Sequence, residues 1–324
     1  MSDIQLFRLG ADGRATELQS AASDLEKPLQ NLIEANLQTL LGICFLASEH
    51  ATGKKHGGRI DTLGIDENHC PVIIEYKRSV GENVINQGLY YLDWLMDHRA
   101  DFKLLVMDRL GIQAANAIDW SAPRLVCIAA DFTKFDAHAV QQIQRNIELM
   151  RYRRFGDDLL LLELAHASST TMPVTAPKGA KPARAEAGSM AASTDALAAT
   201  RQQGPDKSYA ELLPTLSLEL RSVLDSLEAH VLSLGDDVQV KELRRYVAYK
   251  RIRNFACVVL QRARLLLYLH LDAPQTLPAL QAVLPQARDV SAIGHWGTGD
   301  LELPLSSASD LEAVKPFIAQ AYQR

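Results

Sequence analysis

Apolar residues in the first half of the chain recur with two different spacings, one typical of helices and one typical of strands. Between Leu25 and Leu41 they return every three or four residues, which predicts an amphipathic helix. Ser23 and Glu26 fit a capping box at its start. Alternating or continuous apolar runs predict strands elsewhere. We expect strands at about 4–9, 15–18, 58–65, 71–77, 102–108, 124–130, 149–155 and 158–164, and helices at about 83–98, 112–118 and from 136 onwards.

The order of these segments predicts the fold class and the division of the chain. Helix, hairpin, helix and strand in succession predict an α/β domain, a mixed β-sheet flanked by helices, over residues 1–165. Residues 166–207 are rich in Ala, Pro, Ser, Thr and Gly without an apolar period, which predicts a flexible linker. Residues 208–324 predict a second, smaller α+β domain, tethered rather than rigidly docked. A length of 324 residues suits two domains.

The second domain combines helical and strand patterns. Helical spacing runs from Leu212 to Leu234, and a terminal helix is expected at about 310–322. The apolar runs FACVVL and RLLLYLHL predict a hairpin that turns near Gln261.

Between these segments, residues 241–253 alternate cations with aromatic residues. This pattern suits a nucleic-acid surface, because aromatic rings stack on bases while cations contact phosphates. Arg245 and Lys250 are then candidate contacts. A basic helix that packs its aromatic residues inward explains the pattern equally well.

The net charge, the cysteines and the lengths of the apolar runs indicate which class of protein this is. The formal net charge of −5 argues against a uniformly basic coat but leaves local basic patches open. The four cysteines are scattered without CxxC spacing, so neither a zinc site nor a disulfide framework is indicated, and a reducing cytoplasm is expected. The N-terminus lacks a signal-peptide pattern, and no apolar run approaches the ~18 residues that cross a bilayer. We therefore expect a cytoplasmic protein without a membrane partner.

The chemically informative segment is GGRIDTLGIDENHCPVIIEYKR. Strand alternation places Glu75 and Lys77 side by side on one face of an otherwise apolar strand. If a hairpin pairs Ile65 with Pro71, the paired residue numbers sum to a constant, and Asp61 lies directly opposite Glu75. Two opposed carboxylates are destabilising unless a cation lies between them. The register therefore predicts a cation site.

A hard divalent ion suits such a site. Mg²⁺ takes one or two carboxylates and accepts phosphate oxygens, and Mn²⁺ is an alternative. A bound ion stabilises charge on a scissile phosphate and lowers the pKa of a water molecule. Lys77 can orient or deprotonate that water. The combination favours phosphodiester hydrolysis over a purely structural ion.

Asp61 with the Glu75-Tyr76-Lys77 triplet resembles the PD-(D/E)XK nuclease superfamily. Gly58-Arg59-Ile60-Asp61 before the E-x-K strand is similar to the nuclease domain of NucS-like endonucleases, over residues 20–130. The resemblance implies a restriction-endonuclease-like fold and a Mg²⁺- or Mn²⁺-dependent deoxyribonuclease that acts on DNA in repair, restriction or phage defence. It also implies that Glu34 completes the metal site and that Gln87 and Tyr91 form a site element on the following helix.

Substrate preference does not transfer with this resemblance, because NucS-like enzymes carry an N-terminal domain for which this chain has only about 20 residues. Arg59, Lys54 and Lys55 are candidate backbone-phosphate contacts, against the simpler interpretation of solvated surface cations. Segments such as YVAYK and GHWGTGD resemble a family of uncharacterised bacterial C-terminal domains. A homodimer and a protein partner for this domain are left open, and the rival to an enzyme is a non-catalytic binding module on a nuclease fold.

Overall fold

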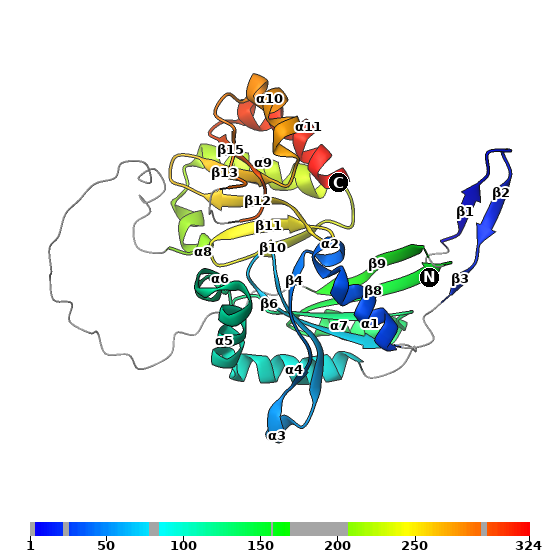
Figure 1. Ribbon diagram of the computed structural model, residues 1–324. Coiled ribbons are helices and arrows are strands. Elements are labelled where there is room, and N and C mark those ends of the chain that lie inside the picture. Colours follow the sequence, from blue (N-terminus) through cyan, green and yellow to red (C-terminus); the bar gives the residue numbers. More distant parts are fainter. Residues whose placement is uncertain (1–3, 22–25, 78–83, 157, 169–206, 293–296) are drawn as a thin grey trace, which may run out of the picture.

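The computed structural model describes residues 4–21, 26–77, 84–156, 158–168, 207–292 and 297–324 (Figure 1). Ser23 of the predicted capping box therefore lies outside the described residues. The predicted linker lies outside them too, except for residue 207 and residues 166–168, which end a strand. Of the helices in the described ranges, none is long and apolar enough to cross a membrane.

The N-terminal unit is built on a mixed seven-stranded sheet, which confirms the predicted fold class. Its strand order is β3-β8-β7-β6-β5-β4, and β9 pairs with β8. Strands β4, β5 and β6 are antiparallel neighbours, whereas β6, β7 and β8 run parallel. The strands are β3 (Ser20–Ala21), β4 (Ile43–Ala51), β5 (Arg59–Asp66), β6 (Pro71–Lys77), β7 (Arg124–Ala129), β8 (Asn146–Phe155) and β9 (Leu159–Ser168).

Helices cover both faces of this sheet, as the near-continuous apolar sequences of β6 and β7 require. On one face, Ile74 and Tyr76 pack against the first two helices. On the other, Ile73 and Leu125 pack under the four helices that follow β6 and precede β8 in the chain. The helices are α1 (Glu26–Ala35), α2 (Leu37–Leu41), α3 (Gly53–His56), α4 (Val84–Asp97), α5 (Arg99–Leu110), α6 (Ile112–Ala117) and α7 (Lys134–Gln142).

The N-terminal hairpin is confirmed as β1 (Leu6–Leu9) and β2 (Ala15–Leu18), a separate two-stranded sheet that stands away from the body (Figure 1). Two predictions for this unit were wrong or incomplete. Residues 102–108 form part of helix α5, in which Phe102 and Val106 are buried at helical spacing while Leu104 is 58% exposed. Strand β4 was not predicted.

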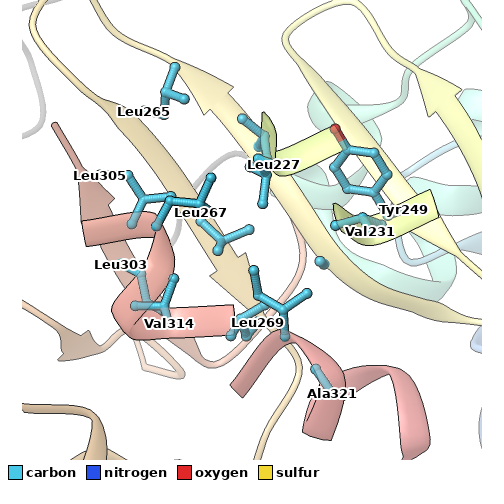
Figure 2. Close-up of a cluster of buried hydrophobic side chains, with 14 of the residues drawn as sticks. Leu227, Val231, Tyr249, Leu265, Leu267, Leu269, Leu303, Leu305, Val314 and Ala321 are labelled. Carbon is cyan, nitrogen blue, oxygen red and sulfur yellow. The ribbon is translucent and has the colours of Figure 1, made fainter. Parts of the chain in front are cut away.

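The C-terminal unit is a six-stranded antiparallel sheet with its helices on one face. Its strand order is β10-β11-β12-β13-β15-β14. Figure 2 shows the core, where Leu227 and Val314 from two helices meet leucines of β13 and β15. The elements are α8 (Tyr209–Leu212), α9 (Leu218–Leu232), β10 (Gln239–Glu242), β11 (Tyr246–Lys250), β12 (Asn254–Leu260), β13 (Leu265–Leu269), α10 (Ala273–Val283), β14 (Arg288–Asp289), β15 (Leu301–Leu305) and α11 (Ala308–Gln323), with a 3₁₀ turn at Leu213–Thr215.

The opposite face of this sheet packs against the N-terminal unit. Cys70 and Ala122 of the N-terminal unit share one buried apolar cluster with Tyr246, Val259 and other residues of the C-terminal sheet. The two units are therefore docked through an apolar interface, and the prediction of a tethered, undocked pair was wrong.

Buried charges join the two units beside this cluster. Arg124 donates to both Asp66 and Glu148, at 2.9 and 2.7 Å. Lys250 from the C-terminal unit donates to Glu148 at 2.7 Å, and Lys241 lies 3.8 Å from Asp66. The neighbouring cations Arg124 and Lys250 hold the pKa of Glu148 well below its usual range, against the effect of burial.

This arrangement contradicts the prediction that Lys250 contacts nucleic acid, because its side chain is 3% exposed and bound to Glu148. Tyr246 and Tyr249 are also buried, and the basic segment forms strands rather than a helix. Arg245 is half-buried. The alternative in which the aromatic residues pack inward is therefore the correct one, although on strands.

We expect Glu148→Gln to lower the free energy of unfolding by about 3 kcal/mol. The substitution removes the negative charge that Arg124 and Lys250 share, while both cations stay buried. Denaturation in guanidinium chloride measures this change. Asp225→Asn, which breaks the exposed pair with Arg221, is the matched control and should cost less than about 1 kcal/mol. Equal effects of the two variants would contradict the account of the interface.

Candidate active site

The hairpin of β5 and β6 carries the two carboxylates of the predicted site. Its ladder pairs Ile65 with Pro71 and ends at Thr62 with Ile74, which confirms the predicted register. At the next pair, Asp61 and Glu75, the backbone N–H groups donate to side-chain carboxylates instead of to backbone carbonyl groups. The Asp61 N–H donates to Glu75 Oε1 at 3.2 Å, and the Tyr76 N–H donates to Asp61 Oδ2 at 3.0 Å. The register therefore brings Asp61 and Glu75 together across the hairpin.

Backbone irregularity marks the same point on the other neighbouring strand. In β4, Ser48 pairs with Thr62 and His50 pairs with Ile60, so Glu49 lies across from Asp61. Glu49 has a φ of 51°, in the left-handed region that non-glycine residues rarely adopt. Strained backbone of this kind concentrates at functional sites.

Burial gives the carboxylate pair unusual electrostatics. Glu75 has no exposed surface, and its Oε2 is a buried oxygen without a hydrogen-bond partner among the described residues. Burial, followed by the charge of Asp61, raises the pKa of Glu75 to about 9. Burial also raises the pKa of the half-buried Asp61. Without a cation, the protein therefore favours a proton on Glu75 at neutral pH.

Glu34 comes from helix α1 and is bonded to Thr62, the residue that follows Asp61. Its Oε1 accepts a hydrogen bond from Thr62 Oγ1 at 2.6 Å and another from Gln30 Nε2 at 2.9 Å. Thr62 and Tyr76 face α1, whereas Glu75 shares the opposite face with Ile73. Across the described ranges, no three or more acidic, histidine or cysteine side chains are grouped so that they could hold a metal ion. The prediction that Glu34 completes the metal site was therefore wrong, because Glu34 lies on the face of the sheet that α1 covers, opposite the face of Glu75.

Gln30 is a site residue that was not predicted. It is 4% exposed, and its Nε2 donates to the carbonyl oxygen of Asp61 at 2.8 Å as well as to Glu34. It therefore ties helix α1 to the backbone that carries Asp61. The available signal was its position one turn before Glu34, which places both side chains on one face of the helix.

Gln87 and Tyr91 lie on helix α4, as predicted, but they support the backbone rather than contact the carboxylates. The Tyr91 hydroxyl accepts from the Arg59 N–H at 3.2 Å and lies 3.5 Å from Gln87 Nε2. A Cβ atom at Gly58 would approach the Tyr91 hydroxyl to 2.6 Å, so this contact requires glycine. The two residues therefore hold the segment that leads into Asp61.

The predicted phosphate contacts are distributed around the start of β5. Arg59 is exposed and lies 3.5 Å from Glu49, which also pairs with Lys27. Lys54 and Lys55 belong to the short helix α3, but their side chains lie outside the described part of the structure. Lys77 ends β6 and is partly exposed.

The donor set suits a hard divalent cation. Mg²⁺ and Mn²⁺ are bound by carboxylate oxygens, often only one or two from the protein with water completing the shell. The unpartnered Glu75 Oε2 and the opposed Asp61 carboxylate provide such donors. Asp61 and Glu75 are therefore the residues that make this site suitable for a divalent cation.

Comparison with known proteins gives a family match for the C-terminal unit and a relative that is similar over nearly the whole chain. Residues 210–324 match a family described as a domain of unknown function, DUF5655. An uncharacterized protein of Haemophilus influenzae is 28% identical over 318 residues, covering 95% of this chain and 96% of that protein. That alignment extends over both units.

Two solved structures show weak similarity. One is the crystal structure of a repair endonuclease from Pyrococcus abyssi, at 17% identity and a TM-score of 0.27, covering 40% of this chain and 48% of that one. The other is an EndoMS–dsDNA complex, at 17% identity and a TM-score of 0.23, covering 40% and 46%. The match spans less than half of either solved chain.

The raised pKa of Glu75 predicts how stability changes with pH. The folded state holds a proton that the unfolded chain loses near its ordinary pKa of 4.5. This stabilisation is complete below about 4.5 and is lost progressively as the pH rises towards 9, by at most about 1.4 kcal/mol per pH unit. Thermal unfolding in EDTA from pH 5 to 9 should show a smaller decline in Glu75→Gln than in the wild type.

Mn²⁺ should restore part of the lost stability of the wild type at high pH, because the ion replaces the proton between the carboxylates. Glu17→Gln, an exposed strand residue of the N-terminal hairpin, is the control and should follow the wild type. Identical pH profiles of wild type and Glu75→Gln would contradict the assignment of the proton to Glu75.

Proposed function

We propose that this protein is a divalent-metal-dependent nuclease that hydrolyses phosphodiester bonds in DNA. The observation that carries the proposal is the Asp61–Glu75 pair, with a buried, unpartnered Glu75 Oε2. Burying two carboxylates together is costly unless a cation or a proton neutralises them. The location of Lys77 two residues after Glu75 adds a cation on the same strand.

Asp61 and Glu75 would hold Mg²⁺ or Mn²⁺. When bound, the ion would supply Lewis-acid stabilisation of the phosphate and a more acidic water molecule. Lys77 Nζ, as an ammonium, would orient the attacking water, and its charge would offset the negative charge that develops on phosphate. Glu34 would support the site through Gln30, which holds the Asp61 carbonyl oxygen.

The substrate that we propose is DNA. Exposed Arg59 lies three residues after helix α3, which contains Lys54 and Lys55, so a backbone-phosphate contact there would place DNA beside Asp61. The resemblance of the D…E-x-K arrangement to PD-(D/E)XK nucleases supports DNA over other phosphodiesters. Repair, restriction and phage defence are the settings consistent with such an activity.

The direct test incubates the full chain with labelled single-stranded, duplex and branched DNA in Mg²⁺, Mn²⁺ or EDTA. We expect metal-dependent cleavage of at least one substrate by the wild type. Asp61→Asn and Lys77→Ala should each reduce the rate by about 10²-fold or more, because each removes a charge that the transition state requires.

Two exposed residues on neighbouring helices serve as matched controls. Asp97→Asn and Lys103→Ala make the same chemical changes away from the site and should retain wild-type rates. Absence of cleavage by the wild type on every substrate would reject the enzyme and leave a binding module. Cleavage that persists in both site variants would place the activity elsewhere.

A further inference from the structure

The C-terminal unit holds the turn of the same hairpin that carries the candidate active site. Strands β5 and β6 are joined at residues 67–70, and Asp61 and Glu75 lie near the opposite end of the hairpin. At about 3.4 Å per residue, some five residues of strand separate the turn from Asp61 by roughly 17 Å. One hairpin therefore connects the interface with the site.

Polar contacts from the C-terminal unit converge on this turn. Asn68 Oδ1 accepts hydrogen bonds from the Tyr246 hydroxyl at 2.9 Å and from Asn254 Nδ2 at 2.6 Å. The Asn254 N–H donates to Glu67 Oε1 at 2.6 Å. Asn68, Tyr246 and Asn254 are all buried. These contacts determine where the turn lies, because buried polar groups are costly to leave unpaired.

The turn is also organised from within by Asp66. Its Oδ1 accepts from the N–H groups of Asn68 and Cys70, both at 2.9 Å. Its Oδ2 pairs with Arg124 and lies near Lys241. The same carboxylate thus shapes the turn and takes part in the charge network between the units.

The charges of the two units are complementary at this surface. The N-terminal unit contributes two carboxylates, Asp66 and Glu148, against one cation, Arg124, whereas the C-terminal unit contributes Lys241 and Lys250. The docked charges are compensated only across the interface, so removal of one partner from the docked state would be strongly destabilising. The charged surface of the N-terminal unit is therefore complementary to that of the C-terminal unit of the same chain.

The C-terminal sheet has no described face left for a stacking surface. Tyr249 belongs to the core beneath α9 and α11, and Tyr246 belongs to the cluster against the N-terminal unit. Base stacking requires exposed aromatic rings, and both rings are covered.

We propose that the C-terminal domain acts as a positioning domain, which clamps the β5–β6 turn and thereby holds Asp61 and Glu75 in register. Asn68, Tyr246 and Asn254 are its positioning residues. Their effect on catalysis rests on the proposed nuclease function, whereas their effect on the hairpin does not.

Hydrogen–deuterium exchange of the full chain tests the clamp without any assay of activity. Tyr246→Phe removes only the hydroxyl that reaches Asn68. Loss of one buried hydrogen bond should speed amide exchange in residues 59–66 and 71–77 by about five-fold. Tyr268→Phe is the matched control, because it removes a buried hydroxyl bonded to Glu302 within the C-terminal unit. This control should leave exchange in the hairpin unchanged.

Asn68→Ala tests the same contact from the other side, and the double variant with Tyr246→Phe should be less than additive. Unchanged exchange in the hairpin of both single variants would overturn the proposal. Uniformly faster exchange across both units would also overturn it, since that indicates general destabilisation rather than positioning.

Cleavage kinetics then separate this proposal from the nuclease function. We expect Tyr246→Phe to lower kcat several-fold with little change in KM, because the displaced residues act on the reacting phosphate rather than on the bound strand. Faster hairpin exchange with no cleavage by the wild type would uphold the clamp and reject the nuclease. If Tyr246→Phe exchanged at the wild-type rate while the wild type cleaved DNA in a metal-dependent way, the nuclease would be upheld and the clamp rejected.

Discussion

The pairing of β5 with β6 is the constraint on which the rest of the structure depends. Its register sets Asp61 against Glu75 at one end and places the Asp66–Cys70 turn at the other. A shift by one residue would turn every side chain of a strand to the opposite face. Both faces of this hairpin are buried, so such a shift would also expose apolar residues that now pack under helices.

Buried acids at the two ends of the hairpin are neutralised in different ways. Asp66 and its neighbour Glu148 are matched by Arg124, Lys241 and Lys250, two of which come from the C-terminal unit. Glu75 retains a buried oxygen without a partner in the described parts of the chain, and its pKa is raised. A buried acid that is paired with cations of the protein is typical of a structural ion pair. A buried acid that lacks such a partner and must bind a proton or an ion is typical of a functional site. The unpartnered oxygen makes this contrast, because burial also raises the pKa of Glu67 at the turn, to about 7, although its Oε1 accepts from the Asn254 N–H.

Local patterns predicted the hairpin, because its short turn and apolar faces allow only one register. The same reasoning failed at residues 102–108, where Leu104 and Met107 looked like strand residues but are exposed on helix α5. Strand β4 was missed because its edge sequence, ICFLASEHA, mixes polar residues with few β-branched ones. Docking of the units was beyond local reasoning, since Lys250 and Glu148 are 102 residues apart in the chain. Gln30 escaped notice because its partners come from two other elements.

The proposed function requires that Asp61 and Glu75 together bind a divalent cation. Isothermal titration calorimetry of the full chain with Mn²⁺ measures this most directly. We expect one Mn²⁺ to bind per chain in the wild type, and this binding to be lost in both Asp61→Asn and Glu75→Gln. Absence of Mn²⁺ binding by the wild type, or binding that survives in both variants, would contradict it.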